Sequence, residues 1–120
     1  KLVDGGIVLG SQTVLLAGIN DQLKVLKRLM ERLLLKRTRP YALYQCDLTQ
    51  GSGHFRTPIQ TGLDLIEGLR QCTSGYAVPQ YIADPPGGKV SLHPNSIISK
   101  SATGYVLKNW EGNIVSYPDI

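Results

Sequence analysis

Several features that would assign a protein to a class are scarce in this sequence. Its 120 residues include only two cysteines, Cys46 and Cys72, which are far apart and outside any CxxC-type spacing. Neither a zinc site nor an iron–sulfur site is therefore indicated. No stretch is long and apolar enough to cross a bilayer, and no basic-then-apolar signal peptide opens the chain. Two cysteines without a secretory signal favour reduced thiols and a cytoplasmic protein.

Positive charge is present but modest, with a net charge of +4. The basic residues concentrate between Lys24 and Arg39, where leucines recur among them at helical spacing. A nucleic-acid surface would carry aromatic residues in such a patch, so we interpret this one as the solvent face of a helix. We expect neither a nucleic-acid nor a membrane partner. The chain opens on Lys1 rather than Met, which indicates part of a longer protein.

The order of apolar runs and turns predicts an α/β fold. Strands are expected at 14–17, 41–48 and 76–82, and helices at 22–37 and 58–70. Val14–Ala17 is apolar throughout, which is typical of a strand buried on both faces. This β-α-β-α-β order predicts a parallel unit covering 1–89. Short β-rich pieces at 90–92, 96–98, 105–107 and 114–117 predict a small antiparallel cap over 90–120.

Capping residues mark the helix boundaries. Asn20 or Asp21 can cap the first helix, and Pro40 stops any continuation of it. Thr57 is expected to be the N-cap of the second helix, with Gln60 completing a capping box. A parallel unit of this kind has an open sheet edge. We therefore expect self-association as a homo-oligomer, or a tail that wraps back over that edge.

Three charged residues follow the predicted strands. Asp47 and Asp84 each come at the end of an apolar strand, which places both at one edge of the sheet. Two carboxylates there suit a cationic substrate group, or an acid/base pair. Lys89 follows two prolines and two glycines on a shaped turn. An amine in a partly dry pocket has a lowered pKa and can condense with an aldehyde such as pyridoxal phosphate. Each of the three also has a simpler interpretation, as a loop brace or a solvated charge.

Several longer strings resemble the C-terminal third of the lysine 2,3-aminomutase family. They are Leu9–Asp21, Arg39–Leu48, Gly53–Pro58, Thr73–Pro79, Pro94–Asn95 and Asn109–Gly112. The resemblance runs in order over nearly all of the chain. It implies a partial (βα) barrel, and a reaction that moves the amino group of L-lysine from C2 to C3.

The resemblance also implies cofactors and site residues. The family uses a [4Fe-4S] cluster and S-adenosylmethionine to make a radical, together with pyridoxal phosphate. By motif, Lys89 resembles the lysine that holds pyridoxal phosphate. Asp47 and Asp84 resemble the acids that bind the side-chain ammonium of the substrate, and Gln12 resembles a residue beside S-adenosylmethionine. Keeping both acids favours lysine over glutamate, because an anionic side chain would be repelled.

Three departures limit what this chain can do alone. The CxxxCxxC motif that binds the cluster is absent, so we expect this segment to be inactive by itself. Relatives commonly have a longer glycine run than the Gly87-Gly88 pair before Lys89. The cysteines with which some members bind zinc between subunits are also missing, so no metal is predicted. Two alternatives stay open: a chain that only binds or assembles, and a relative acting on a translation-factor lysine.

Overall fold

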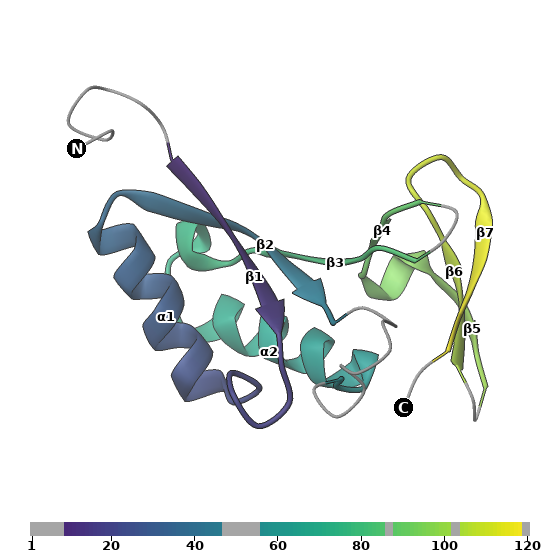
Figure 1. The fold of residues 1–120 in the computed structure, drawn as a ribbon, viewed down its shortest axis with the longest axis horizontal. Helices are drawn as coiled ribbons and strands as arrows, with labels where there is room; N and C mark the ends of the chain where they lie inside the picture. The colour runs from purple at the N-terminus through teal and green to yellow at the C-terminus, as the bar shows by residue number, and fades with distance from the viewer. Residues whose placement is uncertain (1–8, 47–55, 86–87, 102–103, 119–120) are drawn as a thin grey trace.

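The structure is a computed structural model that describes residues 9–46, 56–85, 88–101 and 104–118. Figure 1 shows two helices packed on one sheet and a second sheet beside it. The helices are α1 (Leu23–Leu35) and α2 (Ile59–Cys72), with single 3-10 turns at Gly75–Ala77 and Pro94–Ser96. The strands are β1 (Leu9–Leu15), β2 (Thr38–Gln45), β3 (Gln80–Ala83), β4 (Val90–Ser91), β5 (Ile97–Lys100), β6 (Gly104–Lys108) and β7 (Ile114–Pro118).

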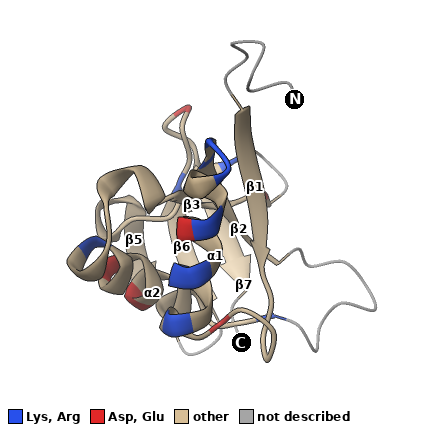
Figure 2. Cartoon of the chain, turned by 90° about the vertical axis from the view of Figure 1, so that its left-hand side faces the viewer, with Lys and Arg blue, Asp and Glu red and all other residues tan. Residues whose placement is uncertain are grey.

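The first sheet has the order β1-β2-β3-β4. Strands β1, β2 and β3 are parallel, and β4 returns antiparallel to β3. Both helices lie against the same face of this sheet (Figures 1 and 2). The predicted parallel β-α-β-α-β unit is therefore confirmed, as a mixed α/β fold. The other face of the sheet is not covered by a helix among the described residues.

The buried core lies between the helices and the covered face of the sheet. It contains one large side chain from each parallel strand and the inward residues of both helices, namely Leu15, Leu43, Tyr81, Leu26, Met30, Ile59, Leu65, Ile66 and Leu69. These helix positions recur at three- and four-residue steps, so each helix buries one stripe. The basic residues of α1, coloured blue along its ribbon in Figure 2, are exposed or half-buried, as the solvent-face interpretation predicted.

Strand β1 differs from its expected form. Val14 is 45% exposed, so the strand is not buried on both faces as predicted. The strand also begins earlier than expected and ends at Leu15, before the chain turns at 17–20. The apolar run is explained by burial of alternate residues on one face only. The remaining apolar residues of the run lie on the uncovered face and in the turn.

Strand β2 starts before Pro40, not after it. Arg37 has a positive φ of 56°, and this left-handed residue ends α1. The register between β1 and β2 shifts at Ser11/Gln12, with Ser11 opposite Pro40 and Gln12 opposite Ala42. Tyr41 is therefore the extra residue of a β-bulge. A bulge tolerates proline within a strand because the ladder is already interrupted there.

Both predicted helix caps are wrong. The N-caps are Gln22 and Pro58, and neither makes a side-chain capping bond. Asn20 instead closes the end of β1: its Oδ1 accepts from the N–H of Leu16 at 2.7 Å, and its Nδ2 donates to the carbonyl of Val14 at 2.9 Å. The side chains that the local pattern assigned to capping make other hydrogen bonds instead: Asn20 with the backbone of β1, and the Thr57 hydroxyl with Gln45.

The third strand is shorter than predicted. Residues 75–77 form a 3-10 turn in which the Ser74 side chain accepts from the N–H of Tyr76 at 3.3 Å. Pairing with β2 then begins at Gln80. The Tyr76 ring is exposed and lies beneath the guanidinium of Arg39, which is 5.6 Å from the ring centroid. Local turn bonds therefore displaced the start of the strand toward the C-terminus.

The antiparallel tail forms a separate sheet of order β5-β6-β7. Tyr105, Leu107 and Tyr117 of this sheet join the same core cluster as the helices. Arg56 ties the tail to the start of α2, donating to the carbonyl of Pro118 at 3.0 Å. The tail lies on the β4 side of the first sheet (Figure 1), so β1 stays an edge strand among the described residues. Neither described helix is long and apolar enough to span a membrane.

Candidate functional site

The uncovered face of the parallel sheet brings together side chains from all three strands. Val14 of β1 pairs with Tyr44 of β2, and Tyr44 pairs with Ile82 of β3, so these three form one row. Side chains alternate between the faces of a strand. The rows on either side of it, which contain Leu43 and Leu15, face the helices, and the row of Tyr44 faces away from them. The strands also end at matching positions, as the prediction of one functional edge requires.

Lys89 reaches this face from the connection between β3 and β4. Its Nζ donates a hydrogen bond to the Tyr44 hydroxyl at 3.3 Å and lies 5.7 Å from the centroid of the Tyr44 ring. The preceding residue, Gly88, has a φ of +121°, which L side chains rarely adopt. The glycine thus permits the bend that directs the lysine amine back over the end of β2.

The amine of Lys89 is exposed rather than held in a dry pocket. Its pKa lies above the ordinary value of 10.5, first because Tyr44 accepts its hydrogen bond and interacts with its charge, and then because of Asp84 and Tyr41. Burial lowers the pKa less than these contacts raise it. The expected lowering of the pKa is therefore wrong for the described residues, because desolvation on the uncovered sheet face is outweighed by the contacts with Tyr44 and Asp84.

Of the remaining predicted residues, Asp84 and Gln12 are among the described residues and Asp47 is not. Asp84 is exposed directly after β3, and its charge acts on Lys89. Gln12 is on β1, exposed, and its Nε2 donates to the Tyr41 hydroxyl. Asp47 lies outside the described residues, so a convergence of both carboxylates with Lys89 stays a prediction.

Sequence reasoning missed the two tyrosines of β2. Tyr41 and Tyr44 contact Gln12 and Lys89, respectively, and the hydroxyl groups supply polar partners that the predicted site lacked. The alternation of the strand could have shown that Tyr44 faces away from Leu43. Tyr41 could not have been placed in this way, because the bulge displaces it from the regular alternation.

A buried polar cluster braces the end of β2. Gln45 Nε2 donates to the carbonyl of Thr57 at 2.6 Å, and the Tyr81 hydroxyl donates to Gln45 Oε1. Gln45 and Thr57 flank residues 47–55, so these bonds hold together the two ends of the segment that contains Asp47. An amide can satisfy both partners at once because it offers a donor and an acceptor.

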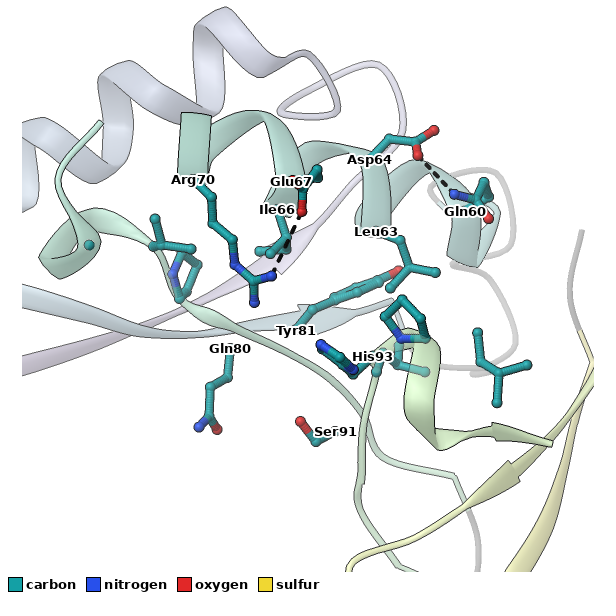
Figure 3. A pocket seen from close by; sticks show the side chains of 16 residues that line it. Gln60, Leu63, Asp64, Ile66, Glu67, Arg70, Gln80, Tyr81, Ser91 and His93 are labelled. Carbon is teal, nitrogen blue, oxygen red and sulfur yellow. Dashed lines mark hydrogen bonds and ion pairs between the residues drawn. The ribbon is translucent and has the colours of Figure 1, made fainter. Parts of the chain in front are cut away.

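A hollow of about 910 Å³ lies between α2 and the β3–β4 strands (Figure 3). The polar side chains that α2 contributes to it are paired with one another: Gln60 donates to Asp64 at 2.8 Å, and Arg70 lies 3.8 Å from Glu67. Lys89 is not part of its lining. This hollow is therefore separate from the part of the uncovered sheet face that Lys89 occupies.

The candidate metal ligands among the described residues do not cluster. Over 9–46, 56–85, 88–101 and 104–118, no three His, Cys, Asp or Glu side chains are grouped as a metal site would require. Cys46 is buried at the end of β2 and Cys72 is exposed at the end of α2. The described part of the chain thus offers no ligand set for an iron–sulfur cluster.

Parallel strands with helices on one face define an α/β protein, and Tyr44, Asp84 and Lys89 lie near the carboxyl ends of its strands. In folds of this class, ligands commonly bind at that edge of the sheet. Residues 66–120 match the family model described as lysine-2,3-aminomutase. The chain is 53% identical over 121 residues to the L-lysine 2,3-aminomutase of Bacillus subtilis, covering 99% of this chain and 26% of that protein.

Other relatives agree. The L-lysine 2,3-aminomutase of Fusobacterium nucleatum is 52% identical, over 98% of this chain and 28% of its own length. The glutamate 2,3-aminomutase of Clostridioides difficile is 40% identical, over 99% of this chain and 29% of its own length. The chain belongs to the lysine 2,3-aminomutase family and is similar to the C-terminal part of its members. It spans about a quarter of the length of these relatives.

Proposed function

We propose that this chain is the substrate- and cofactor-binding C-terminal part of a lysine 2,3-aminomutase. The full-length protein would move the amino group of L-lysine from C2 to C3. One observation carries the proposal: Lys89 and Gln12 lie on the uncovered sheet face, each bound to a tyrosine of β2. The identity of about 50% to L-lysine 2,3-aminomutases supports the same reaction.

Lys89 fits the role of holding pyridoxal phosphate. Its amine is accessible, and Gly88 and Tyr44 direct it to one position over the end of β2. When bound, pyridoxal phosphate would supply an aldehyde that links to the migrating amine and a conjugated ring that delocalises the unpaired electron of the radical reaction. A protonated amine is not a nucleophile, and the pKa of Lys89 lies above 10.5. Lys89 must therefore lose its proton before it can take up the aldehyde.

Asp84 fits the recognition of a cationic substrate group. It is exposed at the carboxyl end of β3, and its carboxylate already favours a positive charge, that of Lys89. Asp47, which follows β2 in the sequence, would be its partner. Two carboxylates attract an ammonium and repel a carboxylate, so this pair favours lysine over glutamate as substrate.

Gln12 would contact S-adenosylmethionine. Its carboxamide stands exposed on the uncovered face, and the Tyr41 hydroxyl holds its Nε2 in place. The [4Fe-4S] cluster does not fit the described residues, because they form no group of three candidate ligands. We therefore propose that the cluster is held elsewhere in the full-length protein, and that this chain alone does not make the radical.

The proposal can be tested by mixing the chain with pyridoxal phosphate, reducing with borohydride and mapping the labelled peptide. We expect the label at Lys89, and its loss in Lys89→Arg. Lys100 is a matched control, because it is also exposed and also lies over a tyrosine ring, 5.6 Å from that of Tyr105. Labelling spread equally over Lys89 and Lys100 would contradict a cofactor site and favour a chain that only binds or assembles.

The substrate can be tested by competition in the same assay. L-lysine added before reduction should displace the label from Lys89 more strongly than L-glutamate does. A lysine-containing peptide that competes better than free L-lysine would favour a relative that acts on a protein lysine. Equal competition by L-glutamate would contradict the assignment of Asp47 and Asp84 to the substrate ammonium.

A further inference from the structure

The turn between β6 and β7 lies directly against the backbone of Gly88 and Lys89, which we call the Lys89 arm. The main-chain N–H of Trp110, in this turn, donates to the carbonyl of Lys89 at 3.4 Å. A Cβ built on Gly88 would come within 3.3 Å of Asn109 Nδ2 and 3.5 Å of Trp110 Nε1. The arm and the tail sheet therefore touch at two consecutive arm residues, Gly88 and Lys89.

Asn109 is the residue that shapes this turn. It is 5% exposed, which is unusual for an asparagine in a hairpin connection. Its Oδ1 accepts from the N–H of Glu111 at 3.0 Å and from that of Asn113 at 2.9 Å. Its own N–H donates to the carbonyl of Asn113 at 2.9 Å, so the turn is closed on both sides.

The β6–β7 turn restricts where the lysine amine can go. Lys89 itself is exposed, and its side chain has one described hydrogen bond, to Tyr44. A long side chain on an exposed loop loses such a single contact easily, because ordering it costs conformational entropy. Anchoring the Lys89 carbonyl to Trp110 reduces this cost, since the backbone from which the side chain starts is already held.

We propose that Asn109 is a positioning residue that holds the Lys89 arm through the β6–β7 turn. The antiparallel tail sheet thereby acts on the position of the Lys89 amine through the backbone of Gly88 and Lys89. The assignment of Lys89 to a cofactor rests on the proposed function. The mechanical link between Asn109 and the arm does not, so the two can fail separately.

The first experiment compares Asn109→Ala with two controls, Asn109→Asp and Asn113→Ala, in the whole chain. The carboxylate introduced by Asn109→Asp can accept the same two N–H bonds, and Asn113 contributes main-chain groups to them, so both controls should keep the turn. Hydrogen exchange at the Trp110 amide reports the contact with Lys89. Acetylation of Lys89 by acetic anhydride, relative to Lys100, reports the environment of the amine.

In Asn109→Ala we expect Trp110 amide exchange to rise by about tenfold, equivalent to about 1.4 kcal/mol. Lys89 acetylation should rise severalfold, because an amine released from Tyr44 returns toward its ordinary pKa and is neutral more often. Lys100 should not change. Exchange at the core amide of Leu43 separates this from general loosening, which would accelerate Leu43 as well. Asn109→Asp should restore Trp110 protection.

A second variant keeps the proposal testable if Asn109→Ala does not fold. Gly88→Ala strains the arm at φ +121° and places a methyl group against Asn109, while leaving the turn itself intact. It should produce the same rise at Trp110 and Lys89, and the two substitutions combined should add little to either alone.

Three outcomes decide the matter. A local response at Trp110 and Lys89, with Leu43 unchanged, supports the proposal. Folded Asn109→Ala or Gly88→Ala proteins with unchanged exchange and acetylation would overturn it. A positive response in these assays, combined with no pyridoxal phosphate label at Lys89, would leave Asn109 as the positioning residue of the arm and remove the cofactor assignment.

Discussion

The two faces of the parallel sheet are built from alternate residues of the same strands, yet they have opposite properties. On the helix-covered face, Leu15 and Leu43 are 0% exposed. On the uncovered face, Val14 is 45% exposed and Tyr41 is 47% exposed. One face is committed to stability and the other is available for ligands. In this chain, a shift of one residue along a strand therefore moves a side chain from the buried core to the exposed face, where the proposed site lies.

The largest expected effect is a truncation on the covered face. Leu43→Ala removes a fully buried side chain from the core cluster, which should lower the free energy of unfolding by about 2–5 kcal/mol. Tyr44→Phe, one residue further on the opposite face, should lower it by less than about 0.5 kcal/mol. Urea unfolding followed by circular dichroism measures both, and similar losses for the two variants would contradict the division between faces.

The next effect concerns the buried cluster at the end of β2. Gln45→Leu leaves the Thr57 carbonyl and the Tyr81 hydroxyl without the partner described here. Loss of such buried partners costs about 1–3 kcal/mol. Gln12→Leu, on the uncovered face, is the matched control and should leave the midpoint of thermal unfolding close to that of the unchanged chain. A larger loss in Gln12→Leu would reverse the comparison.

A smaller effect is expected on the ionisation of Lys89. Tyr44→Phe should lower its pKa toward 10.5, and Asp84→Asn should lower it less, because Tyr44 makes the larger contribution. A raised folded-state pKa means that the contact stabilises the protein below pH 10.5 and is lost as pH rises through the folded-state pKa. Nuclear magnetic resonance titration of Lys89 Nζ measures both shifts. A larger shift in Asp84→Asn than in Tyr44→Phe would contradict this order.

The smallest effect concerns assembly at the β1 edge. If the uncovered face and this edge associate between copies, light scattering should show an apparent mass that rises with concentration. Val14→Lys places a charge beside the edge and should reduce that rise while leaving the unfolding midpoint nearly unchanged. A mass that stays at that of one chain across all concentrations would remove the expectation of a homo-oligomer.

Much of the fold could be predicted from local patterns. The apolar stripe of α1, including Leu26 and Met30, follows from its three- and four-residue spacing, and the strand order follows from the alternation of strands and helices. Predictions failed where a tertiary contact competed with a local one. Thr57 is an ordinary capping residue by sequence, but its hydroxyl donates to Oε1 of buried Gln45 at 3.5 Å, and no side-chain capping bond forms at Pro58.

The site was also predictable only where its residues are close in sequence. Asp84 and Lys89 are close in sequence, so their proximity follows from the turn between them. Tyr41 depends on a bulge that the sequence does not announce, because the register shift is set by the pairing of β1 with β2. The dry pocket expected around Lys89 would need cover on the second face of the sheet, which the described residues do not supply.

Local sequence was enough to set the order of strands and helices and the stripes that each helix buries. These depend on periodicity and turn chemistry over a few neighbouring residues. The folded chain was needed to show that the Tyr44 hydroxyl accepts a hydrogen bond from Lys89, which lies 45 positions later. It was also needed to show that the Trp110 N–H donates to the Lys89 carbonyl. Such contacts depend on strand register and on how two sheets pack, which no short stretch of sequence specifies.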